Sequence, residues 1–273
     1  MNYLISLILV LVGCASAGGL PSVAIDHNRE GAEALALDEL DTAESRFRLA
    51  LEYHPRFAEP HANLGLVMLR RGDLQAAEDH LRTAIQLNAD FDEAWANLGV
   101  VLLHRGEREA AIEAFETALA IDPGLTDARS NLAKTWMKVE RFAEARAQWM
   151  RLLQQTPTPR VRAMLAYCEL RLERPSAARE QAEQALREAP DEPVGRVVRG
   201  VLHAQAGRFH SAVEDLLHAQ GDPMVGFDAR LRLAAVELAR GNRDHAETRI
   251  AALRREAPRH PAVVFLVSAL SEP

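Results

Sequence analysis

The sequence predicts an all-α protein built from stacked pairs of antiparallel helices. The composition is rich in Ala, Leu, Glu and Arg and has only 5% aromatic residues, which favours helix at most positions. No run of alternating Val, Ile, Thr or Tyr has the pattern of a strand. The chain also repeats itself: HANLGLVMLRRGD begins at His61 and WANLGVVLLHRGE at Trp95, and a weaker copy, RSNLAKTWMKVER, begins at Arg129. Each copy starts 34 residues after the one before.

The charge balance limits the kinds of partner that this chain can bind. The formal net charge is −7 over 273 residues, so phosphate backbones should repel the protein and we expect no nucleic-acid partner. Almost all of the basic charge is arginine. The two lysines, Lys134 and Lys138, are four residues apart and therefore share one helix face.

The first element along the chain is an apolar run from Leu4 to Val12. It has the length of a signal-peptide core and is shorter than the roughly 20 residues that a membrane-spanning helix needs. The run ends in LVGC, which closes at Cys14. This ending resembles the lipobox of bacterial lipoproteins, in which the cysteine is acylated and becomes the new N-terminus.

The lipobox resemblance implies a signal peptide at residues 1–13 and palmitate-type acyl chains on Cys14 that hold the protein on a membrane. Because Ala15 rather than Asp follows the cysteine, it also implies the periplasmic face of the outer membrane. The leader MNY departs from the pattern, since it contains no Lys or Arg. The alternative is an ordinary signal peptide cut near Ala17, with an incidental Cys14.

A short tether, residues 14–23, leads into repeats that cover residues 24–258. Each repeat has a small residue, an apolar residue four places later that is large in all but one copy, and another small or apolar residue three places after that, and most end in a proline about five residues further on. This pattern recurs at Ala43, Ala77, Ala111, Ala145, Ala178, Ala212 and Ala246. A second small residue lies about twelve places before each of these, at Gly31, Gly65, Gly99, Ala133, Ala166, Gly200 and Ala234.

These positions predict two helices in each repeat. Small residues where the helices cross allow close approach, and the large residues fill the space between the helices. Glycines between the two segments, at Gly72, Gly106, Gly207 and Gly241, permit the left-handed conformation that ends a helix. We predict repeats that start near residues 24, 58, 92, 126, 159, 193 and 227, and that stack because one pair alone cannot bury its apolar face.

Residues 259–273 follow the last repeat. Pro261 to Leu270 is predicted to form a helix that caps the exposed face of the last repeat. Its run AVVFLVSAL is apolar on more than one side, so the alternative is that it docks to a partner or to a second copy of the chain.

The repeat pattern resembles the tetratricopeptide repeat (TPR), W-x₂-L-G-x₂-Y, A-x₃-F, P. Trp95-Ala96-Asn97-Leu98-Gly99 reproduces its first part. The resemblance covers nearly the whole chain after the tether. It implies a right-handed superhelical solenoid of about seven helix-turn-helix units plus the C-terminal capping helix, with the first helix of each repeat lining a concave face.

No catalytic constellation stands out in the sequence. It contains no Gly-rich phosphate loop, H-E-x-x-H or G-x-S-x-G motif. His203, His210 and His218 lie in one repeat, but no Cys or acidic pair sits at ligand spacing beside them. Cys168 lies on an apolar helix and is expected to be buried and inert. We therefore expect no enzymatic activity, no cofactor and no metal.

Binding is the expected function, and one row of residues suggests where it occurs. Asn63, Asn97 and Asn131 are 34 residues apart, each one place before the Leu of the repeat motif. An Asn side chain can pair with the amide and carbonyl of an extended peptide, and a similar ladder is known in TPR proteins that hold extended peptides. The alternative is that these amides form hydrogen bonds within the scaffold.

Other residues of the first helices complete the predicted groove. Lys134 and Lys138, joined by Arg171 of the fifth repeat, would form a basic patch suited to a carboxylate; the alternative is a solvated helix face. The apolar positions of the groove are Leu66, Leu69, Val100 and Leu103. The predicted ligand is thus a protein or peptide with apolar side chains and an acidic or C-terminal end.

In outline, the lipobox, short tether and repeats resemble the pilotin lipoproteins of type IV pilus systems, which bring secretin subunits to the outer membrane. This resemblance implies a scaffold for pilus biogenesis in the bacterial envelope. The alternatives are an adaptor that recruits cell-wall hydrolases and a regulatory subunit of another envelope enzyme. The sequence predicts no oligomeric state.

Overall fold

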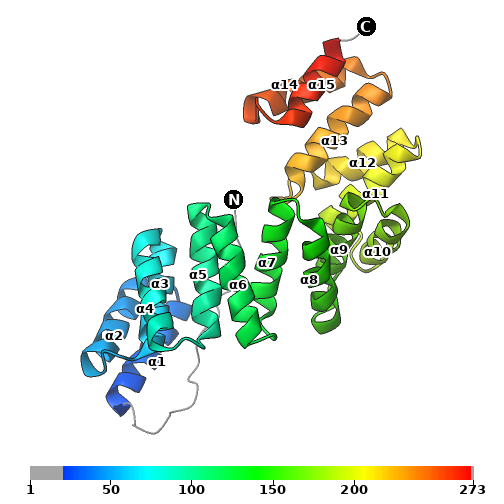
Figure 1. Ribbon diagram of the computed structural model, residues 1–273. Helices are drawn as coiled ribbons and strands as arrows, with labels where there is room; N and C mark the ends of the chain where they lie inside the picture. The colour runs from blue at the N-terminus through cyan, green and yellow to red at the C-terminus, as the bar shows by residue number, and fades with distance from the viewer. Residues whose placement is uncertain (1–20, 272–273) are drawn as a thin grey trace. The chain divides into compact units, whose positions relative to one another are not determined.

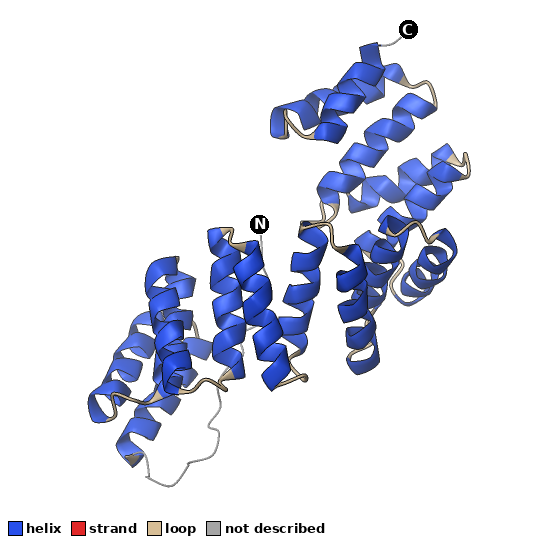
Figure 2. Ribbon diagram, in the orientation of Figure 1, coloured by secondary structure: helices blue, strands red, loops and turns tan. Residues whose placement is uncertain are grey.

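The computed structural model describes residues 21–271, and that part of the chain is entirely helices and the turns between them (Figures 1 and 2). The predicted all-α repeat fold is confirmed. The helices are α1 (Ser22–Ala36), α2 (Leu40–Tyr53), α3 (Ala58–Arg71), α4 (Leu74–Leu87), α5 (Asp92–Arg105), α6 (Arg108–Ile121), α7 (Thr126–Lys138), α8 (Phe142–Gln155), α9 (Pro159–Arg171), α10 (Pro175–Glu188), α11 (Pro193–Gln205), α12 (Phe209–Ala219), α13 (Gly226–Ala239), α14 (Arg243–Glu256) and α15 (Pro261–Ser271).

The described residues divide into two compact units, which meet at Glu140 and Arg141. The first unit contains α1 to α7 and the second contains α8 to α15. Within each unit, consecutive helices pair in order along the chain, and the first helices of neighbouring repeats also touch, as α3 does α5 and α9 does α11.

Glycine and a large apolar side chain fix the crossing of the two helices in several repeats. A Cβ added at Gly99 would lie 2.6 Å from Cε1 of Phe115, and one added at Gly31 would lie 2.6 Å from Cε1 of Phe47. Both phenylalanines are fully buried. The small residue is therefore required because the facing ring occupies the space that a methyl group would need.

The turn between the two helices of a repeat uses a left-handed residue. Gly72, Gly106, Gly207 and Gly241 have φ between 71° and 84°, as the sequence pattern predicts. The first, fourth and fifth repeats have no glycine at this place, and there the left-handed residues are Asp38, Glu140 and Glu173, with φ of 62°, 60° and 57°.

Two sets of interactions in the second unit tie α9 to later parts of the chain, one to the seventh repeat and one to the ends of the fifth and sixth repeats. The Tyr167 hydroxyl of α9 donates to Oδ2 of Asp228 in α13 at 3.1 Å. Arg160, in the first turn of α9, donates to Glu192 at 2.8 Å and to Asp222 at 3.0 Å. The fifth and seventh repeats are thus connected directly as well as through α11, which lies between them in the sequence.

The helix α15 packs against α13 and α14, with Val263 and Leu266 buried among Ala234, Ile250 and Leu253. Its other side leaves Val264 and Phe265 exposed, at 53% and 68%.

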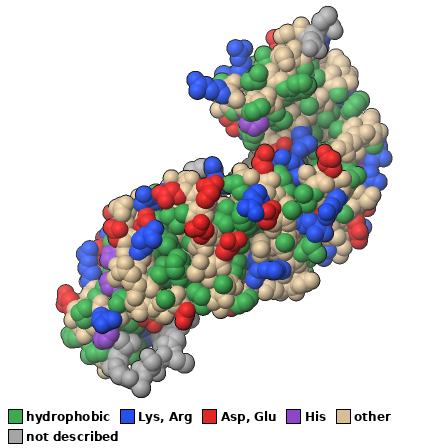
Figure 3. Space-filling view, in the orientation of Figure 1, with side chains coloured by type: hydrophobic (Ala, Val, Ile, Leu, Met, Phe, Trp, Pro, Cys, Tyr) green, Lys and Arg blue, Asp and Glu red, His purple; other side chains and the backbone are tan. Residues whose placement is uncertain are grey.

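The charged side chains on the outside of the helices follow the pattern expected of solvated faces. Acidic and basic groups are interspersed on the face shown in Figure 3. Pairs one helical turn apart include Arg82 with Glu78 at 2.7 Å and Arg29 with Glu33 at 3.1 Å. None of the described helices is both long enough and apolar enough to cross a membrane.

Candidate functional site

The first helices of the repeats carry every predicted groove residue, and we call the surface they form the first-helix face. In the first unit the structure places Asn63 inside the scaffold rather than on this face. Asn63 is only 1% exposed, and its Nδ2 donates to Oδ1 of Asn28 in α1 at 3.1 Å. The prediction of an open amide at Asn63 is therefore corrected, because Asn28 of the preceding repeat takes up the hydrogen bond that a peptide would need.

The other two asparagines of the row differ from Asn63 and from each other. Asn97 is buried at 6% exposure, and its Nδ2 has no hydrogen-bond partner among residues 21–271. Asn131 is half-buried. The expected ladder of open amides is therefore reduced to Asn131, since a peptide cannot reach groups that the neighbouring helices cover.

The predicted apolar lining is also largely in the core. Leu66, Leu69 and Leu103 are buried, at 2%, 6% and 9% exposure. Only Val100 is half-buried. The three leucines hold the repeats together, and this corrects their assignment to an open groove.

The two lysines lie on α7 in the first unit. Lys134 is half-buried and Lys138 is exposed. Lys138 occupies the position of His104 one repeat later. Burial lowers the pKa of His104, and the charge of Lys138 lowers it further, so the ammonium group is close enough to act on the imidazole.

Arg171 lies in the second unit, at the end of α9. Its guanidinium lies over the ring of Phe142, 4.1 Å from the ring centroid, in a cation–π arrangement. Arg171 is half-buried.

A pocket of about 340 Å³ opens on the first-helix face of the second unit. It lies between α11 and α13, with α12 behind it. The residues that line it are Val201, Ala204, Gln205, Phe209, Leu216, Arg232, Ala235, Val236 and Ala239. Most are apolar, and Arg232 supplies a cation whose pKa is raised by Asp228 against the opposing effect of burial.

Several residues that line this pocket occupy the same repeat positions as the predicted groove residues. Val201 and Ala235 are the counterparts of Lys134, and Gln205 and Ala239 are the counterparts of Lys138. The seventh repeat has alanine at both positions, and these short side chains leave space that longer ones would fill. The two alanines are the sequence signal that could have located the pocket.

Three features of the sequence lie outside this surface. Cys14 and the rest of the predicted signal peptide fall outside the described residues. Cys168 is fully buried, and burial raises the pKa of its thiol to about 12, which makes it inert at neutral pH. Across residues 21–271, no group of three or more His, Cys, Asp or Glu side chains is placed to hold a metal ion.

The paired helices, the small residues at their crossings and the pocket between successive first helices define a helical-repeat protein of the scaffold class. Two family models described as tetratricopeptide repeat match the chain, one over residues 28–90, 63–126 and 169–223 and the other over residues 102–168. The chain belongs to the tetratricopeptide repeat family. Proteins of this fold serve as scaffolds for protein–protein interactions.

Solved structures share the fold at low sequence identity. A tetratricopeptide repeat protein from Parabacteroides merdae has a TM-score of 0.66 at 16% identity, over 92% of this chain and all of that one. The pilF protein of Pseudomonas aeruginosa has a TM-score of 0.59 at 23% identity, over 77% of this chain and 96% of that one. YrrB, described as a TPR protein with an unusual peptide-binding site, has a TM-score of 0.55 at 20% identity, over 67% and 92%. No curated protein matches the sequence.

Proposed function

We propose that this protein is a non-catalytic scaffold of the bacterial envelope, held on a membrane by lipid on Cys14, that binds an extended segment of a partner protein on the first-helix face. The observation that carries the proposal is the pocket between α11 and α13. It is apolar over most of its surface, has a cation at one edge, and lies where successive repeats present equivalent positions.

The lining of the pocket defines the segment it fits. Phe209, Leu216 and Val236 form an apolar wall for one aliphatic or aromatic side chain of the partner. Arg232 can pair with a carboxylate that follows that side chain, although Asp228 already accepts one hydrogen bond from Arg232 at 2.7 Å. The exposed amide of Gln205 can bond to the backbone of the bound segment.

The particular role that we propose is a pilotin-like assembly factor for type IV pilus or secretin biogenesis. The lipobox, the short tether of residues 14–23 and the repeats support this role, as does the structural similarity to the pilF protein of Pseudomonas aeruginosa. A tether of about nine residues reaches roughly 30 Å when fully extended, so the repeats would stay close to the membrane.

Lipidation is tested by labelling cells with a clickable palmitate. The wild-type protein should be labelled and sediment with membranes, whereas Cys14→Ser should do neither. Equal labelling of both proteins would refute the lipid anchor, and the pocket proposal would then be tested on a soluble chain.

Partner binding is tested with a photo-crosslinking amino acid at Ala235, inside the pocket. The crosslinked partner is identified, and its affinity is then measured for Ala235→Arg, which fills the pocket. Ala251→Arg on the exposed side of α14 is the matched control. We expect Ala235→Arg to abolish binding and Ala251→Arg to preserve it.

The identity of the partner separates the proposed roles. A secretin or pilus component would support the pilotin-like role, and a cell-wall hydrolase would instead support an adaptor. Unchanged affinity in Ala235→Arg would refute the pocket as the binding site.

A further inference from the structure

At three junctions between repeats, a charged residue on the second helix of one repeat pairs with the opposite charge on the first helix of the next. In every case, the residue on the second helix immediately follows the small residue that recurs in the repeat pattern. The pairs are Glu44 with Arg71, Glu78 with Arg105, and Arg146 with Glu169.

The third of these junctions has a further cation. Glu169 is buried at 4% exposure, and besides Arg146 it faces Arg174, the N-cap residue of α10, at 3.6 Å. One carboxylate therefore neutralises two guanidinium groups, one from the preceding repeat and one from the turn after its own helix.

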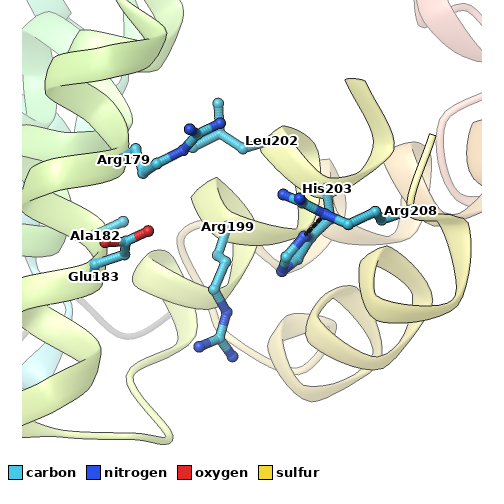
Figure 4. Close-up of a pocket in the computed structure, with 7 residues that line it drawn as sticks. All are labelled: Arg179, Ala182, Glu183, Arg199, Leu202, His203 and Arg208. Atoms are coloured by element: carbon cyan, nitrogen blue, oxygen red, sulfur yellow. Dashed lines mark hydrogen bonds between the residues drawn. The ribbon is translucent and has the colours of Figure 1, made fainter. Parts of the chain in front are cut away.

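At the next junction, between the fifth and sixth repeats, both arginines have counterparts but the carboxylate does not. Arg179 is the counterpart of Arg146, and Arg208, the N-cap residue of α12, is the counterpart of Arg174. Between them, 34 residues after Glu169, stands His203. Figure 4 shows Arg179 on α10 on one side of a small pocket and His203 and Arg208 on the other.

The hydrogen bonds show that His203 does not replace the missing charge. Nε of Arg208 donates to Nδ1 of His203 at 2.8 Å, so Nδ1 is an acceptor and the imidazole is neutral. Burial lowers the pKa of His203, and the neighbouring arginines lower it further although Asp215 opposes them.

The two flanking arginines retain unused donors. Within residues 21–271, Arg179 has no hydrogen-bond or ion-pair partner, and Arg208 has none besides His203. Arg199, the third arginine of the pocket, is already held by two hydrogen bonds to Asp215 at 2.8 and 2.6 Å. Glu183 is the one acidic side chain among the lining residues.

The pocket has the size of a small oxyanion. Its volume is about 50 Å³, enough for roughly three or four water molecules on the same scale. Its seven lining residues are Arg179, Ala182, Glu183, Arg199, Leu202, His203 and Arg208.

We propose that this pocket binds a phosphate group in the position that the carboxylate of Glu169 takes one repeat earlier. Two exposed arginines from different elements, Arg179 and Arg208, line the pocket, and the N–H groups of guanidinium can bond to several oxygens of a tetrahedral anion. A phosphate carries about −1.5 to −2 charges at neutral pH, which matches two arginines that pair with no carboxylate within residues 21–271.

The test uses the full-length Cys14→Ser protein, so that lipid on Cys14 does not interfere. Sodium phosphate is titrated against sodium chloride at equal ionic strength, and binding is followed by the ring resonances of His203 and the amide resonances of α11 and α12. We expect saturable shifts and a rise in the pKa of His203 when phosphate is bound.

Three variants make the test specific. Arg179→Gln/Arg208→Gln should weaken phosphate binding by at least about tenfold, because two charge-assisted contacts are lost. His203→Glu restores the carboxylate seen at Glu169 and should abolish binding while keeping the fold, which circular dichroism would verify. Arg151→Gln, an exposed arginine of α8 far along the chain from the pocket, should bind phosphate as the wild type does.

A second arm identifies the source of the phosphate. Vesicles of phosphatidylglycerol are compared with vesicles of phosphatidylcholine by sedimentation. Binding to phosphatidylglycerol that is lost in Arg179→Gln/Arg208→Gln would assign the site to a lipid headgroup, and saturation by inorganic phosphate alone would assign it to a soluble ligand. Failure of both probes, or equal binding by the wild type and the double variant, would overturn the proposal.

Discussion

Replacing Gly99 with alanine tests directly how the two helices of a repeat are held together. The new Cβ would lie 2.6 Å from Cε1, 2.8 Å from Cδ1 and 2.8 Å from Cζ of Phe115. The ring is fully buried, so it cannot move into solvent to relieve the contact. Overpacking of this kind costs about 1 to 3 kcal/mol, whereas Gly→Ala in a helix gains about 1 kcal/mol. The net expectation is a loss of stability of up to about 2 kcal/mol.

The effect of Gly99→Ala on stability should have the opposite sign when the ring of Phe115 is removed. Phe115→Ala alone costs about 3 to 5 kcal/mol because it leaves a cavity, but in that background the alanine at residue 99 meets no ring. It should then stabilise the protein by about 1 kcal/mol through helix propensity. The fifth repeat already has such a small pair, Ala166 and Ala182, and both are buried.

The four proteins of this double-mutant cycle would be compared by urea unfolding, followed by circular dichroism, and by hydrogen exchange of the amides in α5 and α6. Gly221→Ala is the control, since no atom lies within 4 Å of its added Cβ and its stability should change by less than about 0.5 kcal/mol. An equal effect of Gly99→Ala in both backgrounds would refute the reasoning.

Three further predictions follow from buried polar groups. Asn63→Ala should lower the free energy of unfolding by about 1 to 3 kcal/mol because it leaves the buried amide oxygen of Asn28 unpaired. Asn97→Ala should cost clearly less, because the Nδ2 that it removes has no partner within residues 21–271. Chemical denaturation of the two variants measures both losses, and equal losses would contradict the assignment. Burial, aided by a hydrogen bond with the adjacent aspartate, raises the pKa of Glu93 from 4.5 to about 7. The folded state therefore holds this proton more tightly than the unfolded state does. The stability of the wild type should fall as pH rises from about 4.5 to about 7. Glu93→Gln should remove that fall and stabilise the protein at pH 8 by about 1 kcal/mol, a value reduced for partial exposure, with little effect below pH 4.5; a pH-independent difference in thermal melting would argue against it. In a Cys14→Ser protein, the thiol of Cys168 should react with a disulfide reagent only after unfolding, and rapid labelling of the native protein would show that the thiol is not buried.

The fold was predictable because the repeat pattern encodes packing directly. Gly31, Gly65 and Gly99 recur at the helix crossing, and each faces a large side chain one helix later, so spacing alone identifies the two helices of a repeat. The left-handed turns at Asp38, Glu140 and Glu173 were not predictable in this way. Glutamate rarely adopts positive φ, and aspartate, although it does so more often than most residues, is a much weaker turn signal than glycine.

The site was less predictable because register shows which face a residue is on but not what covers it. Asn63 is on the expected helix, yet Asn28 bonds to it from a position one residue out of register in the preceding repeat. The pocket near Ala235 was missed for the converse reason. Ala235 and Ala239 mark short side chains at two groove positions, but the space they leave is visible only once α11 and α13 are placed.

The hydrogen bond from Tyr167 in the fifth repeat to Asp228 in the seventh changes how the second unit should lose its structure. In most stacked repeats the unfolding free energy is a sum over single repeats and nearest neighbours, so the array can fray one repeat at a time from its end. A connection that skips one repeat adds a contribution to this free energy that is lost when either of the two connected repeats unfolds. The fifth, sixth and seventh repeats should therefore open as one cooperative block, with amide protons of α9 and α13 exchanging at a common rate rather than in a gradient toward the C-terminus.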